Sequence, residues 1–157
     1  MKVIIDTNLL EYAFVKPKEI EFRDLHQKAN VWLRNILRKR DIIFLMSAYQ
    51  AAEVMEVFRK IGATQKAKAS LFKLIEEKFT IKPVYWETVK KAYILTQESN
   101  IHIYDYLVVL PFEKEVGEIF SIDKHLQHPH FQHIGKVINP IRGWVVTEGR
   151  KPIKISE

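Results

Sequence analysis

The chain opens with a short aliphatic run, residues 3–5, that ends directly at an acid, Asp6. A β-branched run of this length is typical of a buried strand. A second such run, residues 119–122, ends at Asp123. Because ligand sites of open α/β sheets lie at the carboxyl ends of their strands, the two acids should meet at one edge of the fold. Two carboxylates at strand ends indicate a site for a hard metal ion.

The rest of the chain alternates between strand-like and helix-like periodicity, which predicts an α/β fold. Strands are expected at residues 3–5, 42–45, 79–82, 118–122 and 136–138. Helices are expected at about residues 22–36, 47–61, 64–78 and 86–96. Residues 103–110 are apolar enough to form either a helix or a strand.

Length and composition narrow the class of protein. The 157 residues favour one domain with a core of ordinary size. There is no cysteine, which excludes disulfides and thiolate zinc sites. No apolar run could cross a bilayer or serve as a signal peptide, so we expect a cytoplasmic protein without membrane contact. The net charge of +6 fits a polyanionic partner such as RNA or DNA, and also an ordinary lysine-rich surface.

Two further acids stand out inside the predicted elements. Glu53 lies among apolar residues of a predicted helix. Glu56 has an oppositely charged partner four positions on, Lys60, whereas Glu53 has none at that spacing. Asp105 interrupts an aromatic and aliphatic run, where an ionised carboxylate is costly unless it is paired or bound to a metal. Structural roles remain open for all four acids: caps for Asp6 and Asp123, a solvated helix face for Glu53, and a first-turn charge for Asp105.

Taken together, the four acids predict a cation site. Carboxylates that converge repel one another, and a divalent cation removes that penalty. Mg²⁺ and Mn²⁺ prefer oxygen ligands. No HExxH pattern is present, which argues against a zinc hydrolase of that type.

The order and spacing of these motifs resemble the PIN domain, the fold of VapC-like ribonucleases. The matching pieces are residues 4–8, 47–53, 104–106 and 121–123, and with the helices between them they span about residues 1–140. The resemblance implies a three-layer α/β/α fold with a central, mainly parallel sheet and an acidic pocket at the strand carboxyl ends. It also implies that the pocket binds Mg²⁺ or Mn²⁺ through four catalytic acids: Asp6, Glu53, Asp105 and Asp123.

The same resemblance implies supporting roles, an activity and partners. Asn8 matches the polar position after the first acid, and Ser121 falls where the family often has Thr or Ser to orient ligands or water. The implied reaction is metal-dependent hydrolysis of RNA that leaves a 5′ phosphate and a 3′ hydroxyl. The implied assembly is a homodimer, with a small antitoxin as partner if the enzyme is a toxin of a toxin–antitoxin pair.

The sequence departs from the family pattern in three places. Pro111 falls within a helix of the family and predicts that the helix kinks or ends there. Residues 16–21 add length before the second helix. Residues 141–157 extend past the nuclease domain of residues 1–140, with a candidate edge strand at 144–146 and loose order expected from residue 150 onward.

Several alternatives stay open. The nuclease could be a toxin, an RNA-processing enzyme without an antitoxin, or a catalytically silent scaffold that binds RNA. A phosphatase of the haloacid dehalogenase type would need an acid at the position of Asn8, which counts against it. Basic residues that could hold the RNA backbone, or simply be solvated, are Lys16, Lys18 and residues 38–40.

Histidines form a separate cluster late in the chain. Four of them lie within nine residues, at positions 125, 128, 130 and 133. Such density could bind a transition metal, although a solvated loop is the simpler interpretation.

Overall fold

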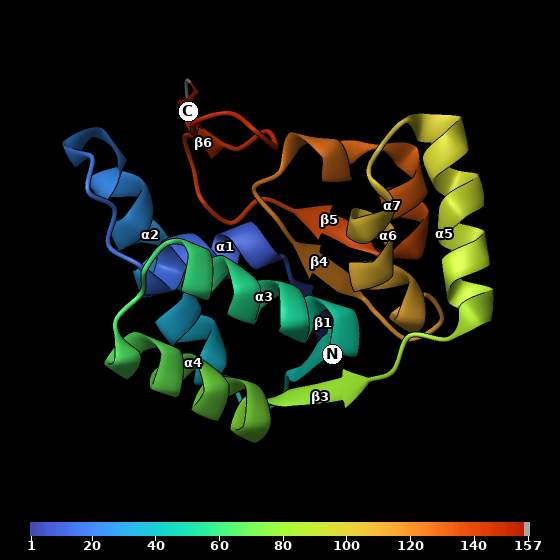
Figure 1. The fold of residues 1–157 in the computed structure, drawn as a ribbon, viewed down its shortest axis with the longest axis horizontal. Helices are drawn as coiled ribbons and strands as arrows, with labels where there is room; N and C mark the ends of the chain where they lie inside the picture. The colour runs from blue at the N-terminus through green and yellow to red at the C-terminus, as the bar shows by residue number, and fades with distance from the viewer. Residues whose placement is uncertain (156–157) are drawn as a thin grey trace.

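A five-stranded parallel sheet lies at the centre of the computed structural model, which describes residues 1–155 (Figure 1). The strand order is β3-β2-β1-β4-β5, and every neighbouring pair is parallel. The strands are β1 Lys2–Ile5, β2 Ile43–Ser47, β3 Phe79–Lys82, β4 Glu118–Phe120 and β5 Lys136–Ile138. The chain builds outward from β1 on one side and then crosses to β4 on the other. The carboxyl ends of β1 and β4 therefore form the switch point at which such sheets bind ligands.

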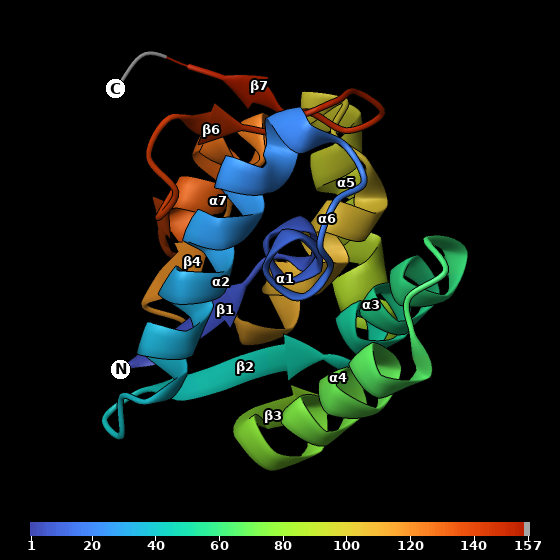
Figure 2. The same cartoon turned by 90° about the vertical axis from the view of Figure 1, so that its left-hand side faces the viewer.

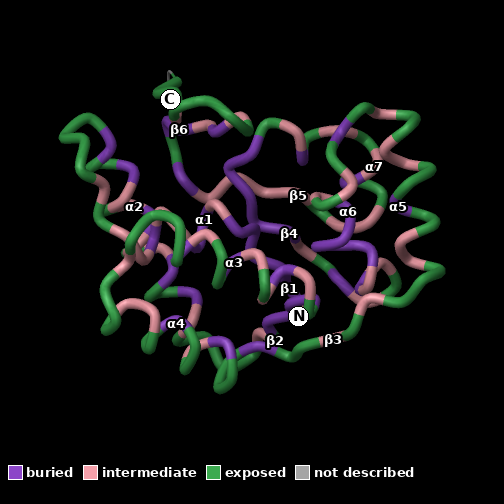
Figure 3. The backbone as a smooth tube through the Cα atoms, viewed as in Figure 1, coloured by how far each residue is buried: buried purple, intermediate pink, exposed green. Residues whose placement is uncertain are grey.

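Two helical layers cover the sheet, because successive side chains of each strand point to opposite faces. Val3 and Ile5 belong to one buried cluster, together with side chains of α1 Thr7–Phe14, α2 Arg23–Leu37, α3 Ala48–Lys60 and α4 Gln65–Lys78. Ile4 belongs to the other, with side chains of α5 Trp86–Ser99, α6 Ile103–Val109 and α7 Pro129–Ile134. Figure 3 shows that β1, β2 and β4 are mostly buried, whereas the edge strands β3 and β5 are more exposed. The predicted three-layer α/β/α fold is confirmed.

The ambiguous segment at residues 103–110 is helical. It forms α6, which ends at Val109 and continues as the short 3-10 helix η2, Leu110–Phe112. Pro111 lacks a backbone N–H and cannot continue the α-helical pattern. The predicted end of the helix at this proline is confirmed.

The inserted segment at residues 16–21 leads into a short 3-10 helix, η1 Ile20–Phe22, that precedes α2. Phe22 is buried, and its ring packs edge-on against the ring of Trp144 with 6.1 Å between centroids. The insertion therefore lies close to the C-terminal segment.

The segment after Pro140 folds back onto the first helical layer. Ile141, Trp144 and Val146 are buried in the same cluster as Val3 and Ile5. The expected strand at 144–146 is β6 Trp144–Val145, and it pairs antiparallel with β7 Ile153–Lys154 in a separate two-stranded sheet instead of extending the central one (Figure 2). The expectation of loose order from residue 150 onward is wrong for residues 153–154, which form β7. Its last two residues, 156–157, lie outside the described residues. The domain division at residue 140 stays a prediction.

No helix within residues 1–155 has the length and apolar character that a membrane crossing requires.

Candidate active site

The four predicted acids line one cavity at the carboxyl edge of the sheet, with a volume of about 240 Å³. They come from four different elements: Asp6 follows β1, Glu53 lies on α3, Asp105 lies in the first turn of α6, and Asp123 follows the continuation of β4. Asn8 also lines the cavity, and Ser121 lies buried behind it. The fold therefore brings together the residues that the sequence singled out, which are more than 100 positions apart at the extremes.

Asp6 and Asp123 are held by one serine. The Ser121 hydroxyl donates to Asp6 Oδ2 at 2.7 Å and accepts from the backbone N–H of Asp123 at 3.0 Å. Asp6 also accepts from the N–H of Thr7 at 2.9 Å, so it caps α1 while facing the cavity. Burial, with a smaller contribution from the charge of Asp123, raises the pKa of Asp6 to about 7.

Glu53 is oriented by two hydroxyl groups. Thr7 Oγ1 donates to one of its carboxylate oxygens at 2.5 Å, and the Tyr49 hydroxyl donates to the other at 2.7 Å. On the same helix the buried Gln50 side chain donates to the carbonyl of Ile5 at 2.6 Å. That bond ties α3 to the end of β1, so the spacing between Glu53 and Asp6 is set by the backbone of the sheet.

Asp105 differs from the other three acids because one of its oxygens is both buried and without a partner among the described residues. Its Oδ2 is shielded from solvent and has no hydrogen-bond partner within residues 1–155. Burial, and then the charges of Asp6 and Asp123, raise the pKa of Asp105 to about 8. Burial also raises the pKa of Asp123. Near neutral pH the cavity therefore disfavours its own negative charge, which is the electrostatic setting that a divalent cation relieves.

Asn8 supplies a second polar atom without a partner. Its Oδ1 is shielded from solvent, and no donor reaches it from any residue that the structure describes. Buried carbonyl oxygens are normally hydrogen-bonded, so an unpaired one that lines a cavity is suited to accept a bond from water or a ligand. This placement is compatible with the supporting role predicted for Asn8.

Residues 147–150 form the rim of the cavity, directly after the buried Val146. The N–H of Val146 donates to the carbonyl of Ile122 at 2.8 Å, and the N–H of Lys124 donates to the carbonyl of Val146 at 2.9 Å. This parallel bridge next to Asp123 brings the rim residues Thr147, Glu148, Gly149 and Arg150 over the acids. Gly149 has a φ of +73°, a conformation that other residues rarely adopt, so the turn at the rim requires it.

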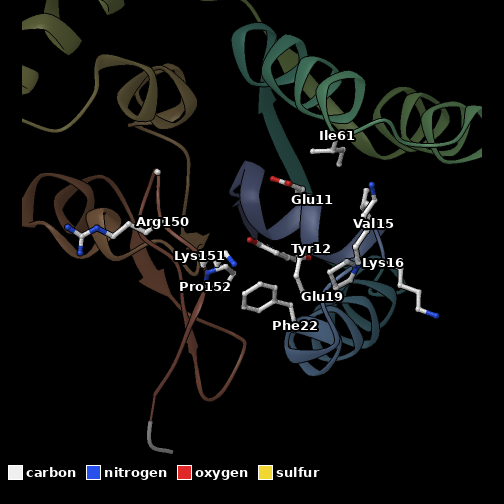
Figure 4. Close-up of a pocket in the computed structure, with 13 residues that line it drawn as sticks. Glu11, Tyr12, Val15, Lys16, Glu19, Phe22, Ile61, Arg150, Lys151 and Pro152 are labelled. Carbon is white, nitrogen blue, oxygen red and sulfur yellow. The ribbon is translucent and has the colours of Figure 1, made fainter.

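A second hollow of about 530 Å³ continues from the acidic cavity, with Glu11, Tyr12, Gly149 and Arg150 common to both. Figure 4 shows Arg150 and Lys151 on one side of this groove and Tyr12, Val15 and Lys16 of the α1 end on the other. Lys16 and Lys18, two of the residues that the sequence suggested for holding an RNA backbone, line this groove. Residues 38–40 do not, because they follow α2 at the opposite edge, where the Met1 ammonium donates to the carbonyl of Asp41.

Sequence reasoning missed four residues of the site: Thr7, Tyr49, Glu148 and Arg150. Tyr49 precedes Glu53 by four positions on a helix, and this spacing could have predicted their contact. Thr7 follows a predicted strand-end acid, but its contact with Glu53 spans 46 positions. No local signal exists for Glu148 and Arg150, because only the return of the C-terminal segment brings them to the cavity.

The four clustered histidines do not form one site. His128 caps α7 by accepting from the N–H of His130, and the His130 ring lies 2.9 Å from the Tyr106 hydroxyl and 3.1 Å from Glu98. His133 is exposed. Only His125 approaches the acids of the cavity. The interpretation of the cluster as a single transition-metal site is therefore wrong.

Comparison with known proteins finds solved structures with a similar fold. No family sequence model and no curated protein sequence matches the chain. Among solved structures, the chain is similar to VapBC2 from Rickettsia felis bound to a DNA fragment from their promoter, with a TM-score of 0.57, 15% identity, and coverage of 88% of this chain and 98% of that one. It is also similar to VapC20 of Mycobacterium tuberculosis, a Sarcin-Ricin loop cleaving toxin, with a TM-score of 0.56, 11% identity, and coverage of 74% and 86%. The PIN-like, VapC-like fold predicted from the sequence is confirmed.

Proposed function

We propose that this protein is a metal-dependent endoribonuclease that hydrolyses RNA phosphodiester bonds, with Asp6, Glu53, Asp105 and Asp123 as its catalytic acids. The observation that carries the proposal is the convergence of these four carboxylates on one small cavity at the switch point of the sheet. The similarity to VapC toxins, one of which cleaves the Sarcin-Ricin loop, supports RNA as the substrate.

The donor set fits Mg²⁺ or Mn²⁺. All four residues offer carboxylate oxygens, which hard divalent cations prefer. The unpaired Oδ2 of Asp105 and the raised pKa values of Asp6 and Asp105 support this assignment, because a cation would compensate the negative charge of the cavity. A bound cation would supply charge neutralisation at a phosphate oxygen and a lowered pKa for an attacking water.

The surrounding side chains keep the acids in position. Ser121 holds Asp6 from behind, and Thr7 and Tyr49 hold both oxygens of Glu53. Such outer hydrogen bonds fix the direction in which a metal-ligating oxygen points. Asp6 and Glu53 therefore enter the reaction already oriented and need little reorganisation.

The adjoining groove provides a path for the RNA strand. Lys16 and Lys18 on one side and Arg150 and Lys151 on the other would contact phosphates. Tyr12 lies between them and at the edge of the acidic cavity, where its ring could stack on a base.

We further propose that the protein is a VapC-like toxin, acting in the cytoplasm as a homodimer and held inactive by a small antitoxin. The similarity to the VapBC2 structure supports the antitoxin partner. Co-purification with the product of a neighbouring reading frame, and relief of growth arrest by that product, would test it. An enzyme that processes RNA without an antitoxin would show neither effect.

The direct test is cleavage of a structured RNA in Mn²⁺ or Mg²⁺. We expect wild-type cleavage to stop with a chelator and to fall at least about 100-fold in Asp6→Asn, because the variant removes one anionic ligand. Asp41→Asn is the matched control, since Asp41 is exposed at the opposite edge of the sheet and should leave cleavage unchanged. Equal cleavage by wild type and Asp6→Asn would place the activity elsewhere. No cleavage by either, with RNA still bound, would favour a silent scaffold.

A further inference from the structure

We propose that Asp105, His125 and Glu148 form a second cation site, beside the four-acid cavity and selective for a transition metal. Each residue offers one ligand atom, and these three atoms lie within 4.8 Å of one another. The residues come from α6, from the 3-10 helix η3 Lys124–Gln127, and from the rim segment. The inference rests on the proposed function in one respect, because Asp105 belongs to both sites.

The spacing suits one ion. Bonds of about 2.1 Å from a divalent cation to nitrogen or oxygen place neighbouring ligand atoms about 3–4 Å apart. Atoms within 4.8 Å of one another reach that range through small side-chain rotations. Three protein ligands leave further positions for water or substrate, as in catalytic metal sites.

Two of the three residues also carry a buried polar atom that lacks a partner. Asp105 Oδ2 and His125 Nδ1 are shielded from solvent and make no hydrogen bond within residues 1–155. Asp123 Oδ1 lies 4.0 Å from His125 Nδ1, which is too far for a hydrogen bond. Buried unpaired groups destabilise a fold, and their concentration at one point is explained if both face a ligand.

Glu148 completes the set from the rim. The backbone bridge between Asp123 and Val146 fixes the chain two residues before it. Its carboxylate is half exposed, and one oxygen lies 3.3 Å from Nδ1 of the exposed His102. An exposed pair of this kind is weak, so a metal ion can compete for the carboxylate.

The imidazole determines the metal preference. Nitrogen ligands suit Zn²⁺, Co²⁺ and other transition ions, whereas Mg²⁺ takes oxygen ligands almost alone. The four-acid cavity offers only oxygens, so the two sites should differ in selectivity. Asp105 connects them, and occupation of the second site would fix the one acid of the cavity that the protein itself leaves unpaired.

The test is a titration of the full chain, labelled with ¹⁵N-histidine, with Zn²⁺ and separately with Mg²⁺. We expect Zn²⁺ to shift the imidazole resonances of His125 and to leave those of His133 unchanged, and Mg²⁺ to shift neither. Calorimetry should show that His125→Ala and Glu148→Gln each weaken Zn²⁺ binding by about tenfold or more, and that His125→Ala leaves Mg²⁺ binding unchanged. His133→Ala is the matched control from the same part of the chain and should bind Zn²⁺ as the wild type does.

The outcomes separate the two proposals. Unchanged His125 resonances in Zn²⁺, or equal Zn²⁺ affinity in wild type, His125→Ala and Glu148→Gln, would overturn the second site even if the protein cleaves RNA. A His125 shift in a protein that never cleaves RNA would uphold the site and remove the nuclease function. The same shift in Asp6→Asn would show that the second site does not depend on Asp6.

Discussion

The floor and the rim of the cavity are built in contrasting ways. The floor, formed by Asp6, Ser121 and Asp123, is buried at the ends of adjacent strands, and its side chains are hydrogen-bonded to one another or to nearby backbone. The rim, residues 147–150, is largely exposed and is positioned by the buried residues that precede it. The floor depends on the sheet, which forms the centre of the fold, whereas the rim depends on how one C-terminal segment packs. Substitutions in the floor and in the rim should therefore impair the protein in different ways.

The largest effect should come from substitution of Trp144, which is buried shortly before the rim residues in the C-terminal segment. Trp144 is 3% exposed, packs against Phe22, and donates its indole N–H to Asp24 at 2.8 Å. Trp144→Ala should lower the free energy of unfolding by about 3–5 kcal/mol, because it leaves a cavity in the first helical layer. Chemical denaturation followed by circular dichroism measures this loss.

Trp86→Ala is the control for that variant, because Trp86 is 66% exposed and should change stability by less than about 0.5 kcal/mol. The pair also tests the predicted boundary at residue 140. If Trp144→Ala changes the stability no more than Trp86→Ala does, the segment is a separable extension. A large loss makes it part of the nuclease domain.

The next largest effect concerns Asp105, whose Oδ2 has no hydrogen-bond partner within residues 1–155. The unfolded chain loses the Asp105 proton near the ordinary value of 3.8, whereas the folded chain has a raised pKa of about 8. The folded state thus binds more protons between these values, and without a metal its stability should fall as the pH rises from about 4 to 8. Asp105→Asn removes this penalty and should stabilise the metal-free protein at pH 8 by about 2–3 kcal/mol, less than the full shift implies because water partly reaches the site.

Thermal unfolding at pH 4 and pH 8 checks this prediction. The gain should be much smaller at pH 4, where the wild-type carboxyl is protonated in the folded state and about half protonated in the unfolded state. It should also shrink or reverse at pH 8 in saturating Mg²⁺, because only the wild type keeps the full ligand set. A variant that is equally stabilised at both pH values would show that ionisation of Asp105 is not the cause.

The contrast between floor and rim also explains what the sequence could predict. Asp6 and Asp123 were found because an acid that ends an aliphatic run is a local pattern, and parallel strands bring such ends together. Asp105 was found because its neighbours are apolar, although the same apolarity left its helix undecided. These signals need no knowledge of distant contacts.

The remainder of the site arises from contacts that no local pattern encodes. Glu148 reaches the cavity because Val146 pairs beside Asp123, and a two-residue strand such as β6 gives almost no periodic signal. The histidine cluster left a single metal site open as an alternative to a solvated loop, because closeness in sequence does not show whether side chains are close in space. The turn at η3 and the start of α7 separate His125 from its three neighbours.

A smaller effect should follow from loosening the floor without removing an acid. Ser121→Ala deletes the hydroxyl that donates to Asp6 and accepts from the N–H of Asp123. We expect Mg²⁺ affinity to fall by about tenfold, roughly 1.4 kcal/mol, because Asp6 loses the bond that fixes its direction. Ser121→Thr keeps the hydroxyl and should restore most of the affinity. Isothermal calorimetry that finds all three proteins equal would remove the positioning role of Ser121.

The smallest effect belongs to the exposed rim. Arg150 lines both the acidic cavity and the groove, and it is free to contact one RNA phosphate. Arg150→Gln should weaken binding of a single-stranded RNA by about threefold and lower the slope of log affinity against log salt by about 0.7, the value for one phosphate contact. Arg38→Gln is the matched control, since it removes the same charge at the opposite edge and should leave the slope unchanged. Equal losses in the two variants would mean that RNA responds to net charge alone, and the rim would then have no part in binding the strand.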